Sequence, residues 1–321
     1  MRMRFVSLVL LCAACTSAPA LAQNYPDRPV RIVVGNLAGS GVDTAARVLA
    51  AKLSDLWPQE VAIDDRPGAN GATAAQIVAN SKPDGITLMM VNNTHAINAL
   101  FAPNQLFDPL ASFDPITLVG QYSFLLIAHP GLAVRSLKEL VASAKTYPGE
   151  LVYGTPGNRS ASRIGMETFI KLADVKMPRI ASEDASSAIT KLVSGQTLVM
   201  LSSYAAVQPQ LKAGRVRALA VAGPRRSALL PAVPTSSESG MPGFTVRGWY
   251  ALLAPAGLPA AIRTKLHDDA VKALRTDAAI RNYNEDNIEV VGGSGEELLA
   301  FLKSEILQYS AQIKAANIKP E

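Results

Sequence analysis

Short apolar runs alternate with helical apolar spacing along most of this chain, and that alternation constrains its fold more than any other feature. Residues 30–34 predict a buried strand, and the apolar spacing of residues 42–56 predicts the helix that follows. The same pattern predicts further strands at 61–64, 86–91, 116–119, 124–128, 151–153, 198–201, 216–221 and 249–253, and helices at 72–79, 137–144, 162–172, 188–193, 260–274, 278–284 and 296–313. Strands that alternate with helices form parallel βαβ units, so the predicted fold class is α/β.

The first 22 residues are typical of a secretory signal peptide. Arg2 and Arg4 precede a short apolar run at 5–14, and Ala20-Leu21-Ala22 is a cleavage site, so the mature chain is expected to begin at Gln23. The run is too short to span a membrane, which needs about 20 apolar residues. A lipid anchor at Cys15 is disfavoured, because Cys12 stands where a lipobox normally has an aliphatic residue.

Composition excludes several kinds of protein. Both cysteines lie in the expected leader, so disulfides, zinc–cysteine sites and cysteine nucleophiles are not expected in the mature chain. The net charge of +5 falls to +3 when Arg2 and Arg4 are removed, and no dense basic run indicates nucleic-acid binding. The remaining 299 of 321 residues are enough for two domains.

Three loops follow predicted strands, where open parallel sheets place ligands. The first, at 36–41, precedes Asp43, and its glycines allow close backbone approach to a carboxylate or phosphate. An equally good interpretation is a plain turn between strand and helix, in which Ser40 or Asp43 caps the helix. The second, at 92–95, is rich in hydrogen-bonding side chains, although a single histidine such as His95 is more often structural.

The third loop, at 154–163, offers Asn, Ser and Arg at a predicted helix start. Arg159 or Arg163 could hold a carboxylate with two hydrogen bonds. The alternative is that both are surface arginines near a helix cap.

Enzyme motifs are missing from the sequence. No G-x-S-x-G or G-K-[ST] is found, and the glycine loop at 39–44 ends in Thr44 where a dinucleotide-binding loop needs glycine. His95, His129 and His267 lack metal-ligand spacing. We therefore expect no catalytic residue, metal or cofactor.

Several stretches, in shared order and spacing, resemble the Bug family, the periplasmic substrate-binding proteins of tripartite tricarboxylate transporters. These stretches are 25–31, the glycine loop ending at Asp43, 66–71, 83–88, 94–98, 230–235, 238–244, Trp249 and 253–257. The resemblance covers nearly the whole mature chain. It implies a two-domain periplasmic binding protein of the Venus-flytrap, type II-like kind, with 23–123 and 247–321 in domain 1 and 124–246 in domain 2.

The resemblance also implies that facing loops grip a small organic acid, largely through backbone amides and hydroxyls. The candidate ligand-binding residues are Leu37, Ala38, Gly39, Ser40, Gly41, Asp43, Asn92, Thr94, His95, Thr155, Gly157, Asn158, Ser160, Ser162, Arg163 and Asp184. The sequence departs from the family at Arg163, where histidine is common, and at 180–184, where Val-Pro-Tyr-Lys-Gly is usual. Leu198 and Ser202 also replace acidic residues.

The expected function is capture of a carboxylate-bearing metabolite in the periplasm by a monomer, for delivery to membrane transporter subunits. The alternative is a sensory protein that binds its ligand and docks to a membrane sensor kinase, because fold alone does not fix the downstream partner.

Overall fold

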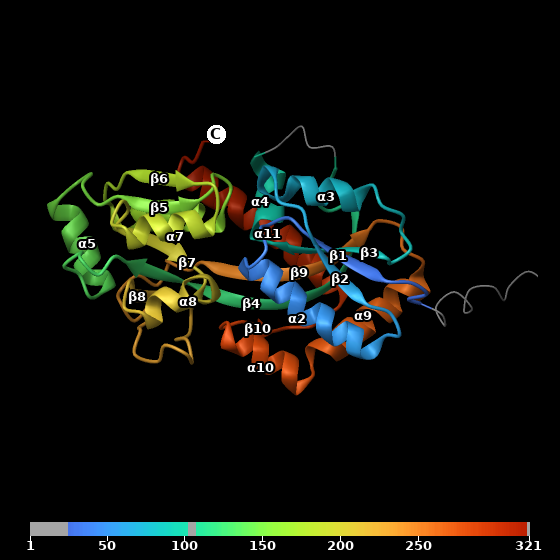
Figure 1. Ribbon diagram of the computed structural model, residues 1–321. Coiled ribbons are helices and arrows are strands. Elements are labelled where there is room, and N and C mark those ends of the chain that lie inside the picture. The colour runs from blue at the N-terminus through green and yellow to red at the C-terminus, as the bar shows by residue number, and fades with distance from the viewer. Residues whose placement is uncertain (1–24, 102–106, 320–321) are drawn as a thin grey trace, which may run out of the picture.

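The computed structural model describes residues 25–101 and 107–319. The expected leader, with Cys15 and the expected cleavage before Gln23, lies outside these residues. The described chain is α/β, with strands in the order β2-β1-β3-β9-β4-β7-β5-β6 and with β8 and β10 also paired to β4 (Figure 1). The strands are β1 (Val30–Val34), β2 (Val61–Asp65), β3 (Thr87–Asn92), β4 (Phe113–Ala128), β5 (Tyr153–Pro156), β6 (Arg179–Ser182), β7 (Val199–Ser202), β8 (Arg217–Ala222), β9 (Arg247–Pro255) and β10 (Glu289–Val290).

The long strand β4 joins two groups of strands. Its first part, through Ser123, pairs antiparallel with β9, and its last part, from Phe124, pairs with β7 and β8. We call β1–β3, β9, β10 and the first part of β4, with their helices, the first lobe. We call β5–β8 and the end of β4, with their helices, the second lobe. The expected division at residues 124 and 246 stays a prediction.

Helices cover both faces of the sheets. They are α2 (Gly41–Leu56), the 3-10 turn η1 (Ala69–Gly71), α3 (Ala72–Ala79), α4 (Asn93–Phe101), α5 (Leu137–Thr146), α6 (Ala161–Ala173), α7 (Ala185–Val193), α8 (Tyr204–Lys212), α9 (Ala260–Leu274), α10 (Asp277–Glu285) and α11 (Gly295–Ala315). In the first lobe, α2, α9 and α10 cover one face, while α3, α4 and α11 cover the other. In the second lobe α6 lies opposite α7 and α8.

One hydrophobic core runs through both lobes. It contains Ile97 of α4 and Leu302 of α11 together with Phe169 of α6, all nearly or fully buried. Two further cores fill the opposite faces, one beneath α2 and α9 and one beneath α7 and α8. The lobes are therefore packed against each other on the α11 side and are also joined by the continuous strand β4 (Figure 1).

Several expectations about elements were wrong. Residues 154–156 of the expected third loop belong to β5, whose strand was expected at 151–153, and residues 161–163 belong to α6. The two strands expected at 116–119 and 124–128 are one strand, because the polar residues Gln121 and Ser123 keep pairing with β9. The loop expected at 92–95 is the start of α4, which begins at Asn93. Strands β6 and β10 and helix α8 were missed. Strand β6 has four residues, two of them exposed, β10 has only two residues, and α8 contains Pro209.

Candidate ligand-binding site

Two helix starts, one in each lobe, form the centre of the candidate site. Helix α2 follows β1, and its N-cap Ser40 accepts a hydrogen bond from the Asp43 amide at 3.4 Å. Helix α6 follows β5, and its N-cap Ser160 accepts one from the Arg163 amide at 3.2 Å. The first N–H groups of a helix have no intrahelical acceptor and carry a partial positive charge, so both starts favour an anion.

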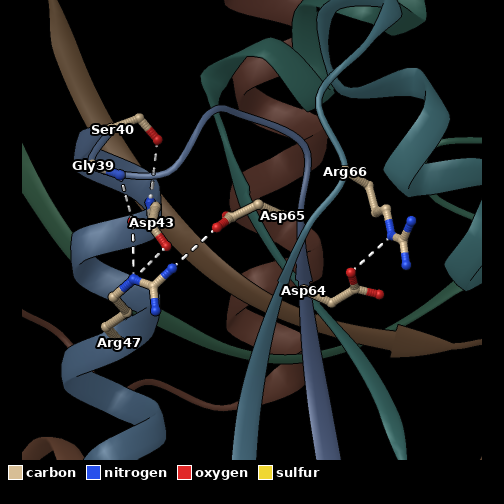
Figure 2. Close-up of polar contacts among 7 residues, drawn as sticks. All are labelled: Gly39, Ser40, Asp43, Arg47, Asp64, Asp65 and Arg66. Atoms are coloured by element: carbon tan, nitrogen blue, oxygen red, sulfur yellow. Dashed lines mark hydrogen bonds and ion pairs between the residues drawn. The ribbon is translucent and has the colours of Figure 1, made fainter.

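Asp43 closes the first loop onto the helix (Figure 2). Its carboxylate is 2% exposed and accepts the Gly39 amide at 2.7 Å. Arg47 Nε lies 2.8 Å from the same carboxylate, and its Nη2 donates to Asp65 at 3.0 Å. Asp43 is therefore a loop-closing residue whose charge Arg47 offsets.

Asp65 is the second carboxylate beside Arg47. Burial and the neighbouring Asp43 raise the pKa of Asp65, and Arg47 partly opposes that rise. Asp64, the next residue back along β2, points away from this cluster and pairs with Arg66 at 2.7 Å (Figure 2). The two adjacent aspartates thus belong to different ion pairs.

The tip of the first loop is open to solvent. Leu37 is 50% exposed, and its carbonyl accepts the Ser40 amide at 3.1 Å. Ala38 and Gly39 are exposed beside it, and Gly39 has a φ of +79°, which favours glycine.

The second group of candidates divides between the helix start and the core. Asn92 Oδ1 accepts a hydrogen bond from the Thr94 amide at 3.0 Å, so Asn92 stabilises the start of α4. Thr94 itself is partly exposed. His95 is buried, lies edge-on to Phe113 and donates Nε2–H to the Pro109 carbonyl at 2.8 Å. Burial lowers the pKa of His95 to about 4. The structure thus places the side chain of His95 in the core.

The third loop lies at the carboxyl end of the second lobe's parallel strands. Thr155 is fully buried and bonds through Oγ1 to the Gly157 carbonyl at 3.3 Å. Gly157 has a φ of +69°, and its amide donates to the Ser182 carbonyl at 2.6 Å. These contacts fix the loop that leads into Ser160.

Three further candidates make bonds within the protein. Ser162 is buried and donates to the Leu201 carbonyl at 2.8 Å. Arg163, 4% exposed, donates to the Asn158 carbonyl at 2.8 Å. Asp184 is the N-cap of α7 and accepts the Ser187 amide at 2.8 Å. Their geometry supports structural roles for these side chains.

Close approaches at Gly41 and Gly157 bring in residues that the sequence did not single out. Tyr250 lies in the same lobe as Gly41, whereas the Gly41–Ser203 and Gly157–Asn70 approaches cross between the lobes. A Cβ on Gly41 would lie 2.6 Å from the Tyr250 hydroxyl and 4.0 Å from Oγ of Ser203, the N-cap of α8. A Cβ on Gly157 would lie 3.1 Å from Asn70 Oδ1. Ser202 and Ser203, two polar residues directly after a predicted strand, could have indicated that Ser203 lies near the site. No local pattern marks Tyr250, which lies inside a predicted strand.

Tyr250 packs against Tyr122 beneath this junction, with ring centroids 5.3 Å apart. Burial raises the pKa of Tyr122 to about 12 and raises that of Tyr250, so both hydroxyls stay protonated at neutral pH. They supply neutral hydrogen-bonding groups next to the start of α2.

The described residues contain neither a metal-binding cluster nor a membrane-spanning helix. Within 25–101 and 107–319, no three His, Cys, Asp or Glu side chains gather where they could hold a metal ion. None of the helices in the described part of the chain is long and apolar enough to cross a membrane.

The architecture is that of a two-domain periplasmic binding protein. A similar solved structure is the periplasmic binding protein BugD, 27% identical, with a TM-score of 0.85 over 92% of this chain and 100% of that chain. Rpa4515 of R. palustris, solved with adipate, is 30% identical, with a TM-score of 0.88 over the same shares. MatC of Rhodopseudomonas palustris, solved with malate, is 27% identical, with a TM-score of 0.82 over 90% of this chain and 100% of that chain.

Sequence comparison gives the family. The model of the TctC family, the tripartite tricarboxylate transporter family receptor, matches residues 45–318. A UPF0065 protein of Bordetella bronchiseptica is 33% identical over 99% of this chain and 94% of its own length. Protein BugT of Bordetella pertussis is 28% identical over 97% and 96%. The chain belongs to the TctC family of solute-binding receptors, which confirms the resemblance to the Bug proteins.

Proposed function

We propose that this protein captures a small carboxylate-bearing metabolite between its lobes and delivers it to the membrane subunits of a tripartite tricarboxylate-type transporter. The observation that carries the proposal is the pair of serine-capped helix starts, α2 and α6, at the carboxyl ends of strands in opposite lobes. Such helix starts suit an anionic oxygen without any charged side chain. The adipate in Rpa4515 and the malate in MatC support a ligand of this class.

The hydroxyls of Ser40 and Ser160 are well suited to this task. Each Oγ accepts an amide hydrogen of its own helix, which leaves the O–H free to donate to a carboxylate. Thr94 and the amide of Gly41 complete the set of donors that we propose for the ligand. The remaining candidates Leu37, Ala38, Gly39, Asn92 and Asn158 would shape the walls. Thr155 and Gly157 would hold the third loop in place through their internal bonds.

We infer that the protein works without catalysis, as a monomer in the periplasm, after cleavage of residues 1–22. We further propose that the domains divide near residues 124 and 246. The change of strand partner in β4 between Ser123 and Phe124 supports this division. Membership of a receptor family supports a binding role rather than a catalytic one.

Calorimetry against a panel of mono- and dicarboxylates that includes adipate and malate tests the proposal. A ligand present at 100 times its Kd should add about 2.7 kcal/mol of stability, which raises the melting temperature. The uncharged diamide of adipate is the control and should give no shift. If no acid in the panel binds or stabilises the protein, carboxylate capture is wrong.

A further inference from the structure

Arg163 joins two segments that are far apart in the sequence. It lies in the first turn of α6 and is 4% exposed. Its Nη1 donates to the Asn158 carbonyl at 2.8 Å, inside the third loop. Its Nη2 donates to the Lys319 carbonyl at 3.2 Å, in the tail that follows α11. One guanidinium therefore binds both the candidate ligand loop and the C-terminal tail.

The tail belongs to a helix of the first lobe. Helix α11 packs on α4 and β4, and its C-terminal end reaches the second lobe beside α6 (Figure 1). There Lys171 of α6 donates to the Ala315 carbonyl, and the side chain of Ile318 is buried in the core shared by both lobes. The tail thus has a fixed place against α6.

The loop is held on its other side by a second arginine. Arg179 of β6 donates to Asn158 Oδ1 at 2.9 Å, while Arg163 binds the carbonyl of the same residue. Asn158 lies between Gly157, whose φ is positive, and Ser160, the N-cap of α6. Its position therefore sets the direction in which the loop enters the helix.

We propose that Arg163 is a positioning residue that orders the loop at 157–160 together with the C-terminal tail. Only the expected effect of Arg163 on ligand affinity rests on the proposed function. Arg163 acts through the Asn158 backbone, so it shapes the anion site without contacting the ligand. A guanidinium suits this task because its fixed fork of N–H donors can bind two carbonyls at once.

Hydrogen exchange of the ligand-free protein tests the ordering. Arg163→Met keeps most of the buried volume and removes the donors. Amides at 157–160 and at 316–319 should then exchange about tenfold faster or more, the effect expected from losing a charged hydrogen bond. Arg163→Lys, which keeps one donor group, should give a smaller increase at one or both segments.

Lys171→Met is the matched control, because it removes a donor from α6 to the α11 end but has no bond to Asn158. It should speed exchange near Ala315 and leave 157–160 unchanged. Unchanged exchange at 157–160 in Arg163→Met overturns the inference. So does an equal increase across the whole second lobe, which would indicate general destabilisation.

Calorimetry with adipate gives the second readout. Arg163→Met should weaken adipate binding about tenfold, and Lys171→Met should not. If the wild-type protein binds no carboxylate, the proposed function is wrong. The exchange data still test whether Arg163 orders the loop and the tail. If Arg163→Met loosens the loop but binds adipate as tightly as wild type, the loop order has no bearing on the site.

Discussion

His95 shows how burial determines what one side chain does. It follows a strand among polar neighbours, which made it a candidate for the site, yet its ring lies in the core beside Phe113. The neutral ring donates to the Pro109 carbonyl and needs no charge. Nothing in the local sequence distinguishes this position from Thr94, because burial depends on Phe113 and other residues that are distant in the chain.

The buried ring predicts a specific pH dependence. Burial lowers the pKa of His95 from its ordinary value of 6.5 to about 4, so the unfolded chain binds a proton in this range and the folded one does not. The free energy of unfolding should therefore fall as the pH drops from 6.5 to 4, by on the order of 3 kcal/mol. Urea unfolding across this range measures it.

His95→Gln should remove most of that dependence, because glutamine carries no titrating group. His267→Gln, at a partly exposed position, is the control for the loss of a histidine elsewhere in the chain. A pH dependence that survives unchanged in His95→Gln would show that other groups cause it.

The residues of the candidate site were predictable to the extent that they sit next to glycine or cap a helix. Ser40 and Ser160 were found from their place after a strand and before apolar helical spacing, and the structure has them as N-caps. Tyr250 was not found, because its place beside Gly41 depends on the packing of α2 on β9. Asn70 was not found, because its place beside Gly157 depends on how the lobes meet. Asp43 and Ser162 were singled out as ligand-binding candidates, but in the structure their side chains bond within the protein.

Among the helices, the start of α6 combines two roles that one substitution can separate. Ser160 caps the helix, and we propose that its hydroxyl also contacts the ligand. Ser160→Ala should cost about 1 kcal/mol of stability through the lost cap. It should also weaken carboxylate binding, because the site loses a donor.

Ser136 provides the matched control. It is the N-cap of α5, accepts the Glu139 amide at 3.2 Å and belongs to the same lobe. Ser136→Ala should lower stability by a similar amount and leave affinity unchanged. Equal affinities in the two variants, measured by calorimetry, would restrict Ser160 to capping.

The strands and helices with strong periodicity were predicted well. The first and last residues expected for the helix at 260–274 are those of α9, because its apolar spacing is regular and Pro259 precedes it. Helix α8 was missed because Pro209 weakens the helical pattern. The two halves of β4 were separated by polar residues that pair with β9, and pairing across the chain is not visible in a local pattern.

The close packing of Gly41 on Tyr250 inside the first lobe predicts a clash that a second substitution relieves. A Cβ on this residue would lie 2.6 Å from the hydroxyl of Tyr250, whose buried ring packs on Tyr122 and cannot easily move. Gly41→Ala should therefore destabilise the protein by about 1–3 kcal/mol. It should also weaken ligand binding, because the same junction brings the start of α2 toward α8.

Tyr250→Phe removes the hydroxyl and should make room for the alanine. In that background Gly41→Ala should become neutral, or stabilising by up to about 1 kcal/mol, since alanine favours helix over glycine. Urea unfolding of the four proteins measures the coupling between the sites. Additive effects of the two substitutions would mean that the clash with the Tyr250 hydroxyl does not cause the destabilisation.

The pairing of β3 with β9 has a consequence for how the molecule is made. Met89 lies opposite Leu253, so the first lobe needs both ends of the chain, whereas strands β5–β8 come from one uninterrupted stretch between them. A chain that is synthesised from its N-terminus can fold the second lobe before β9, the partner of β3, has been made. That unpaired, apolar edge leaves a partly made molecule open to aggregation, and β9, which is synthesised after the whole second lobe, is the strand that closes it.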